Sequence, residues 1–196
     1  MWKRVLFIAL VAWGAYSAWP SRTLSHGPGV VAPQEPIQRE VSGKQAFDFN
    51  GYRITPLAEF SIEARVLARE DYRFGREADT SPTDLVFGWG RMSDEAVLQK
   101  IELSQSNRYY HWRTKEFPIP QREIEVNSAN MHIIPADSTI ARELKNVRKG
   151  QVVRVSGYLV QAAAPDGWRW VSSLTRKDTG TGACELIWAE NLTIVR

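Results

Sequence analysis

The stretch from Lys149 to Val160 limits the fold of this chain more than any other part of the sequence. Lys149-Gly150 has the composition of a turn, because glycine adopts positive φ angles at no steric cost. After the turn, apolar and polar side chains alternate, with Val153, Val155 and Leu159 on one face and Arg154, Ser156 and Tyr158 on the other. A period of two is typical of a half-buried β-strand. Gly157 interrupts this strand, which favours a bend that lets a sheet curl.

Further strand-like segments lie on both sides of this stretch. They are residues 47–54, 60–67, 107–113, 124–134, 168–171, 184–188 and 192–195. Hydrophobic residues make up 43% of the chain and charged residues 24%, which is ordinary for a globular protein. The pattern predicts an α+β fold with a mostly antiparallel, curled β-sheet or small OB-like barrel, short inserted helices and a preceding N-terminal hydrophobic helix. The OB-like alternative is an analogy at the level of the fold only.

Three short helices are predicted between the strands. Ser81-Pro82-Thr83-Asp84 carries a helix-start pattern, with serine at the cap, proline at the first position and an acid three residues after the cap. Gly88 and Gly90 end this predicted helix. A second helix is expected to begin at Ser93 or Asp94, and a third is capped by Ser138.

The N-terminus has the pattern of a targeting or anchoring segment. Lys3 and Arg4 precede an apolar run, residues 5–19, that contains no charge. The run is slightly short for a spanning helix, which needs roughly 20 residues. Trp2 at one end and Trp13 and Trp19 at the other suit the two membrane interfaces, so we expect a retained single-pass inner-membrane anchor with the C-terminal domain in the periplasm. The alternative is a cleaved signal peptide, with Ala15-Tyr16-Ser17 as a poor cleavage motif, and secretion to the periplasm.

The composition divides the chain into three parts: residues 1–19 as the anchor or signal, 20–45 as a flexible tether and 46–196 as a single β-rich domain. The middle part contains Pro20, Pro28, Pro33 and Pro36 and has no periodicity. Cys184 is the only cysteine, which excludes an internal disulfide.

The charge balance disfavours a nucleic-acid partner. The 25 Lys and Arg residues become 23 when Lys3 and Arg4 are set aside, and 23 against 22 Asp and Glu residues leaves a net charge of +1. A nucleic-acid-binding protein usually carries a concentrated basic patch. We expect the membrane, through residues 5–19, as one partner and allow an envelope protein as another.

No convincing catalytic set emerges, and we commit to none. The weak candidates are His111, His132, Asp178 and Cys184. Asp178-Thr179-Gly180 matches the core of the aspartic-protease motif, but charged rather than apolar residues precede it, which favours a loop. Cys184 with a histidine as its base would form a nucleophilic pair. Its place in a predicted strand favours a small buried side chain instead.

No metal or cofactor is predicted, because the chain has no close pair of histidine or cysteine ligands. Polar residues in non-periodic stretches are the better indicators of a binding site, since loops on a rigid sheet often carry function. The binding residues predicted from these stretches and from the aromatic run 109–113 are Arg91, Trp112, Asn130, His132, Arg176 and Asp178.

Several local strings resemble a group of uncharacterised proteobacterial proteins that are membrane-anchored or exported and have no known function. These strings are Trp89 to Asp94, Tyr110-His111-Trp112, Asn130 to Ala136, Asp178-Thr179-Gly180 and Ala183-Cys184-Glu185. The resemblance covers about Phe60 to Trp188. It implies a location outside the cytoplasm and no particular reaction.

The sequence therefore favours a membrane-tethered extracytoplasmic domain that acts without catalysis, in binding or in envelope assembly. One alternative is a hydrolase that uses His111 or His132 with Cys184 or Asp178. Another is an OB-like binder of oligonucleotides or glycans, which needs Tyr109, Tyr110 and Trp112 exposed on one face of a sheet.

Overall fold

The computed structural model describes residues 2, 7, 23–178, 180 and 182–196. The apolar run 5–19 and the poor cleavage motif at 15–17 lie outside the described residues, except for Phe7. Among the described residues, no helix has both the length and the apolar character needed to cross a bilayer.

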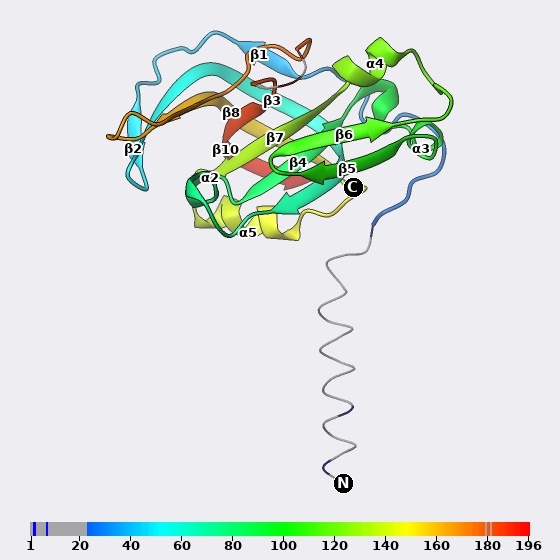
Figure 1. Cartoon of the computed structure of the whole chain (residues 1–196), viewed down its shortest axis with the longest axis horizontal. Helices are drawn as coiled ribbons and strands as arrows, with labels where there is room; N and C mark the ends of the chain where they lie inside the picture. The colour runs from blue at the N-terminus through cyan, green and yellow to red at the C-terminus, as the bar shows by residue number, and fades with distance from the viewer. Residues whose placement is uncertain (1, 3–6, 8–22, 179, 181) are drawn as a thin grey trace.

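Short helices are inserted between the strands of a curled sheet (Figure 1). The strands are β1 (Ile37–Arg39), β2 (Phe47–Phe49), β3 (Tyr52–Asp71), β4 (Thr83–Gly88), β5 (Glu102–Ser106), β6 (Tyr109–Arg113), β7 (Ser128–Pro135), β8 (Val152–Ala163), β9 (Arg169–Val171) and β10 (Glu185–Ile194). The helices are α2 (Arg76–Thr80), the 3-10 helix η2 (Gly90–Ser93), α3 (Glu95–Leu98), α4 (Gln121–Val126) and α5 (Ser138–Asn146).

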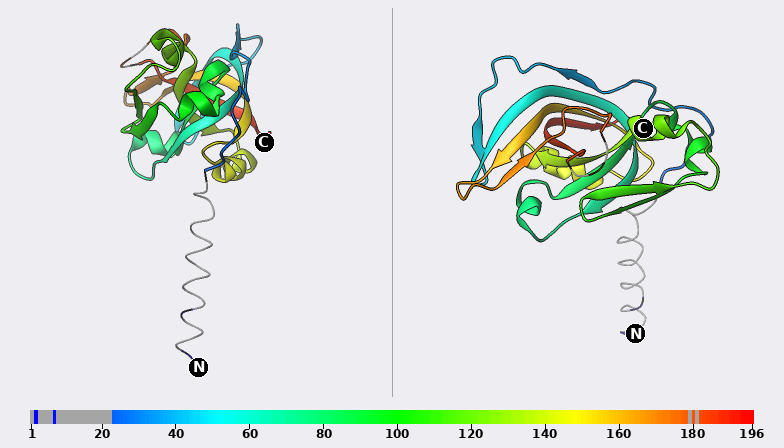
Figure 2. Two further views of the ribbon diagram at one scale, coloured as in Figure 1. Left: turned by 90° about the vertical axis from the view of Figure 1, so that its right-hand side faces the viewer. Right: turned by 45° about the horizontal axis from the view of Figure 1, so that its top comes forward.

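The main sheet has the strand order β1-β3-β4-β7-β10-β8-β9, with β2 paired to β3. All of these pairs are antiparallel except β7 and β10. The long strands β3 and β8 also pair with each other, so the sheet curls back toward its first strands. Figure 2 shows this curl from two further sides, with the separate β5–β6 hairpin outside it. The prediction of a mostly antiparallel, curled sheet with short inserted helices is confirmed.

The largest apolar cluster fills the inside of the curl. Alternate residues of β3, β4, β7, β8 and β10 meet Ile140, Leu144 and Val147 from α5 and the residue after it. Val153, Val155 and Leu159 belong to this cluster, as their alternation predicted. A second cluster on the outside of the sheet contains Trp188, with Trp168 and Trp170 packed against it.

Gly157 lies where β8 passes between β3 and β10, opposite Phe60 and Ala189. Its φ angle is +156°, and a Cβ atom added there would lie 1.9 Å from the carbonyl oxygen of Trp188. A backbone oxygen held in a sheet cannot move aside cheaply. The bend therefore depends on the absence of a side chain.

We expect Gly157→Ala to lower the free energy of unfolding by about 1–3 kcal/mol, the usual cost of overpacking. Urea titration followed by tryptophan fluorescence measures this loss. Gly27→Ala is the control, because a Cβ there meets nothing within 4 Å, and its effect should stay within about 0.5 kcal/mol. Equal stabilities of the two variants would contradict the role of Gly157.

The helix predicted from Ser81-Pro82-Thr83-Asp84 is wrong. Helix α2 ends at Thr80, and Thr83 instead begins β4. All six residues of β4 are buried between β3 and β7, so pairing on both sides outweighs the local capping pattern. Residues 124–134 were also predicted as one strand. In the structure the first three belong to the end of α4, and β7 begins only at Ser128.

The other two predicted helices are present as α3 and α5. Asp94 caps α3 by accepting a hydrogen bond from the Ala96 N–H. The cap of α5 is Asp137, one residue before the predicted Ser138, and it accepts from the N–H groups of Thr139 and Ile140.

The segment predicted as a flexible tether, residues 20–45, lies along the domain from residue 23 onward. The Leu24 N–H donates to the Lys149 carbonyl at 2.9 Å, and β1 pairs with β3. The Ser93 hydroxyl accepts from the N–H groups of Val31 and Ala32 at 3.2 and 3.0 Å. The sequence predicted a free tether, but the structure places this segment against the domain. The reason is that its backbone N–H and C=O groups form hydrogen bonds with groups of the domain.

Candidate functional site

Polar side chains gather on the outer face of three neighbouring strands. Asp84 of β4 lies opposite His132 of β7, and His132 lies opposite Leu186 of β10. Because side chains alternate along a strand, Asn130 and His132 share this face with Cys184, which immediately precedes β10. Asp84, Asn130 and His132 are all buried. Burying polar side chains costs free energy unless they find hydrogen-bond partners, so a buried group of three calls for an explanation beyond core packing.

Asp84 is the centre of this group, and its side chain is fully buried. Arg108 Nη1 donates to Asp84 Oδ1 at 2.7 Å, and Asn130 Nδ2 lies 3.4 Å from Oδ2. His132 Nδ1 lies 2.9 Å from Oδ1. The direction of this contact does not suit an N–H···O bond, so among the described residues His132 Nδ1 has no aligned hydrogen bond. The contact is therefore best described as electrostatic.

Arg108 reaches Asp84 from the tip of the β5–β6 hairpin. Ser106 pairs with Tyr109, so Asn107 and Arg108 form a two-residue turn. Their φ angles are +52° and +70°, as a type I′ turn requires. Glycine is usual at such a position, and an arginine there costs on the order of 1 kcal/mol.

The surroundings of Arg108 hold it in this conformation. Its N–H donates to the Tyr72 hydroxyl at 3.0 Å, and its carbonyl accepts from Asn130 Nδ2 at 2.8 Å. Arg108 Nη1 also donates to the Ser81 carbonyl at 3.0 Å, and the guanidinium lies 3.7 Å from the centre of the Tyr72 ring. The Trp170 ring, which also lines the larger cavity, packs against the His132 ring at a centroid distance of 4.7 Å. The guanidinium is thus fixed before any ligand arrives.

Two cavities lie over this network, and Tyr109 and Cys184 line both of them. The larger has a volume of about 420 Å³ and is also lined by Arg108, His132, Arg169 and Trp170. The smaller has a volume of about 150 Å³. The larger volume lies within the range of small-molecule sites.

Cys184 contributes to the lining of both cavities. Its thiol donates to the Arg108 carbonyl at 3.7 Å and lies 4.0 Å from Asn130 Nδ2. Burial raises the pKa of the Cys184 thiol to about 11, and the nearby carboxylates Glu185, Asp84 and Asp178 act in the same direction. The thiol is therefore protonated at neutral pH, whereas a catalytic cysteine needs a stabilised thiolate.

Glu185 lines the smaller cavity and is fully buried. Burial raises the pKa of its carboxyl to about 8, although the Arg176 guanidinium acts in the opposite direction. Arg176 Nε lies 3.5 Å from Glu185 Oε1. Neither Glu185 oxygen has a hydrogen-bond partner among the described residues, and the same holds for Arg176 Nη1. At neutral pH this contact is mainly that of a neutral acid beside a cation.

The structure brings five of the six predicted binding residues to the two cavities. Trp112, Asn130, Arg176 and Asp178 line the smaller one, and His132 lines the larger. Arg91 lies elsewhere, paired with Glu123 near η2 and α4. Whether these residues bind a ligand stays a prediction.

The four weak catalytic candidates do not all meet. His132 and Cys184 line the larger cavity, and Asp178 lines the smaller. Asp178 accepts a hydrogen bond from the Ser173 hydroxyl at 2.7 Å. His111 is exposed on β6, where alternation places it on the face opposite Tyr110 and Trp112. His111 is not among the residues that line either cavity.

Sequence reasoning missed the residues that organise this site, namely Tyr72, Asp84, Arg108, Trp170 and Glu185. One signal was available, because Asn107-Arg108 lies between two alternating segments and asparagine favours a hairpin turn. In the part of the chain that the structure describes, no group of three or more His, Cys, Asp or Glu side chains is placed to hold a metal ion.

Comparisons of the chain with protein-family models, with curated proteins and with solved structures found no match.

Proposed function

We propose that this protein is a membrane-tethered extracytoplasmic binding module without catalytic activity, and that its ligand site is the pair of cavities at Cys184. The observation that carries the proposal is the fixed guanidinium of Arg108 in the wall of the larger cavity. Three neighbouring groups, the Ser81 carbonyl, the Asp84 carboxylate and the Tyr72 ring, hold it there despite an unfavourable backbone conformation. Strained, fully held residues are typical of binding and active sites.

The free donors of Arg108 indicate the ligand's chemistry. Only Nη1 donates to acceptors among the described residues. The Arg108 side chain is 17% exposed and lines the larger cavity, so its guanidinium is partly accessible to a ligand. Arg169 lines the same cavity. A carboxylate or phosphate group suits these donors, because guanidinium groups bind oxyanions through parallel hydrogen bonds.

The extracytoplasmic location is supported by the sequence. The apolar run 5–19 behind Lys3 and Arg4 favours an inner-membrane anchor with the domain in the periplasm. A cleaved signal peptide remains the alternative. An envelope protein is a further partner that fits this location.

We expect alkylation of Cys184 by iodoacetamide at pH 7 to be about 30-fold slower than that of free cysteine. A pKa of about 11 lowers the thiolate fraction about 300-fold, and the greater nucleophilicity of a basic thiolate recovers about tenfold. Mass spectrometry reports this single site directly, because the chain has no other cysteine. Phosphate or succinate should slow the reaction further in the unmodified chain and have no effect in Arg108→Gly.

The alternative of a hydrolase is favoured by one observation, the 2.9 Å contact of Asp84 with His132 in a cavity that Cys184 also lines. In that case His132 would act as the base for the thiol. The same experiment separates the two functions. Rapid alkylation with a midpoint below pH 7.5 that rises in His132→Ala would indicate the catalytic pair and contradict the binding proposal.

An OB-like architecture is supported by the pairing of β3 with both β4 and β8, and by α5 between β7 and β8. The cavities lie beside β7, and OB folds bind oligonucleotides and oligosaccharides on the face of their second and third strands. The aromatic run fits this use less well. Tyr110 packs inward and bonds the Ser128 hydroxyl, whereas Tyr109 is exposed.

A further inference from the structure

The turn after α5 is where the N-terminal segment joins the domain. The Leu24 N–H donates to the Lys149 carbonyl, and His26 Nε2 lies 2.7 Å from the Gly150 carbonyl oxygen. Gly150 leaves room for this contact, since a Cβ there would lie 1.8 Å from the Leu24 oxygen. Figure 1 shows α5 along the same lower side of the domain at which this blue segment begins.

The length of chain before Leu24 limits how far this side can lie from a membrane. The apolar run ends at Trp19, and 24 minus 19 leaves five residue steps. Five extended residues span at most about 18 Å. If residues 5–19 anchor the chain, the turn after α5 therefore stays within that distance of the bilayer.

Helix α5 and the turn after it are basic. Arg142 and Lys145 are exposed three positions apart in α5, which places them on one face of the helix, and Lys149 is exposed in the turn that follows. Arg148 is half-buried beside them. Among the described residues, none of these four cations has a carboxylate within ion-pair distance, whereas many other arginines of the domain do.

Few acids offset these charges. Between residues 137 and 150 there are four cations and two carboxylates, which leaves a net charge of +2. One of the two acids, Asp137, already accepts the N-cap hydrogen bonds of α5. The other, Glu143, is half-buried.

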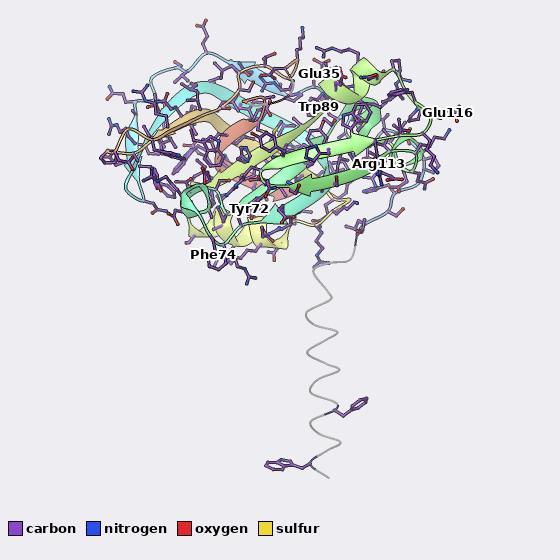
Figure 3. The ribbon with its side chains drawn as sticks, in the orientation of Figure 1. Glu35, Tyr72, Phe74, Trp89, Arg113 and Glu116 are labelled. Carbon is purple, nitrogen blue, oxygen red and sulfur yellow. The ribbon has the colours of Figure 1, made fainter. Side chains whose placement is uncertain are left out.

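An exposed aromatic ring accompanies the basic residues. Phe74 has 92% of its surface exposed and projects from the lower side of the domain in Figure 3. Arg69, five positions earlier, donates to the carbonyls of Leu144 and Val147 at 2.5 and 2.8 Å. These bonds fix the end of β3 against the end of α5, and so keep the Phe74 loop near the basic residues.

We propose that α5, the turn after it and the Phe74 loop dock on the surface of an anionic phospholipid bilayer. This inference rests on the membrane tether of the proposed function and adds a second contact with the same membrane. Basic residues near an anionic surface favour the docked state about fivefold each. Phenylalanine beside lysine and arginine is the composition of surfaces that enter the headgroup region.

The test uses the full chain in lipid nanodiscs, with Cys184→Ser and a fluorophore on Asn146→Cys in α5. Nitroxide-labelled headgroups quench a fluorophore that lies at the bilayer surface. We expect at least threefold stronger quenching in discs that contain phosphatidylglycerol than in phosphatidylcholine discs. The same fluorophore on Glu116→Cys, at the far end of the domain in Figure 3, should show no such difference.

Charge reversal provides the matched control. Arg142→Glu with Lys145→Glu should reduce quenching in anionic discs to the phosphatidylcholine level, and Phe74→Ser should weaken it. Arg113→Glu with Lys115→Glu makes the same change in net charge away from this face and should leave the quenching intact. Circular dichroism checks that each variant is folded.

Two results overturn the inference. Equal quenching in both lipids, or quenching that survives reversal of Arg142 and Lys145, removes the docking face and leaves the tether in place. A chain that does not enter nanodiscs at all removes the tether itself, and with it the docking face.

Discussion

Replacing Asp84 with alanine should lower the free energy of unfolding by about 3–5 kcal/mol, the usual cost of removing one partner of a buried ion pair. Asp84 is fully buried, and its carboxylate is the partner of the Arg108 guanidinium. Without it, the Ser81 carbonyl is the one remaining acceptor for Arg108 Nη1 among the residues that the structure describes. The Asn130 Nδ2 group also loses its contact with Asp84 Oδ2. Urea titration followed by tryptophan fluorescence measures the loss.

Glu102→Ala is the matched control for this prediction. Glu102 also pairs with an arginine, Arg113, but both side chains are mostly exposed. Exposed pairs contribute about 0–1 kcal/mol. The double variant Asp84→Ala with Arg108→Ala should cost less than the sum of its parts, because it leaves no buried charge unpaired. A loss for Asp84→Ala as small as that for Glu102→Ala would show that the network is not needed for the fold.

Glu185 should make the protein less stable as the pH rises from about 4.5 to about 8. Burial raises the pKa of its carboxyl from 4.5 to about 8. Across this interval the unfolded chain has released the proton, whereas the folded chain still holds it. Unfolding then releases a proton, so higher pH favours the unfolded state. The shift of 3.5 pH units corresponds to at most about 5 kcal/mol.

Glu185→Gln should remove this slope, because glutamine has nearly the same shape and does not ionise. Unfolding free energies at pH 5.5, 7 and 8.5 measure the effect. The pKa values of Asp71, Glu95 and Asp166 are lowered, so these carboxylates stay charged throughout this pH range. Their contribution to stability is lost only at more acidic pH and does not affect the measured slope. Glu102→Gln should leave the slope unchanged. If Glu185→Gln retains the full slope, other groups cause it.

The strands could be predicted where the local sequence alone sets their two faces. The alternation from Val152 onward requires one buried and one partly exposed face, and the structure has both. Thr83 to Gly88 has no such alternation, because every residue of β4 is buried. A strand covered on both faces looks like any apolar segment. The nearby serine and proline then favoured a helix that sheet pairing excludes.

The site was only partly predictable for a similar reason. Asn130 and Cys184 belong to polar or unusual strings, and their positions could be suspected from the sequence. Asp84 and Arg108 are 24 positions apart, and the contact between them depends on how the β5–β6 hairpin lies over β4. The sequence shows neither the burial of Asp84 nor the placement of the hairpin.

The sequence by itself determined the β-rich character of the domain, the bend at Gly157 and the turn at Gly150, because each follows from side-chain periodicity or from the special backbone of glycine. Only the tertiary structure decided that the N-terminal segment lies along the domain, that Glu185 is shielded from water, and that Arg108, Asp84 and His132 meet. These features depend on contacts between distant residues. Their physical effects, a shifted pKa or an immobilised charge, arise from the surroundings that folding creates.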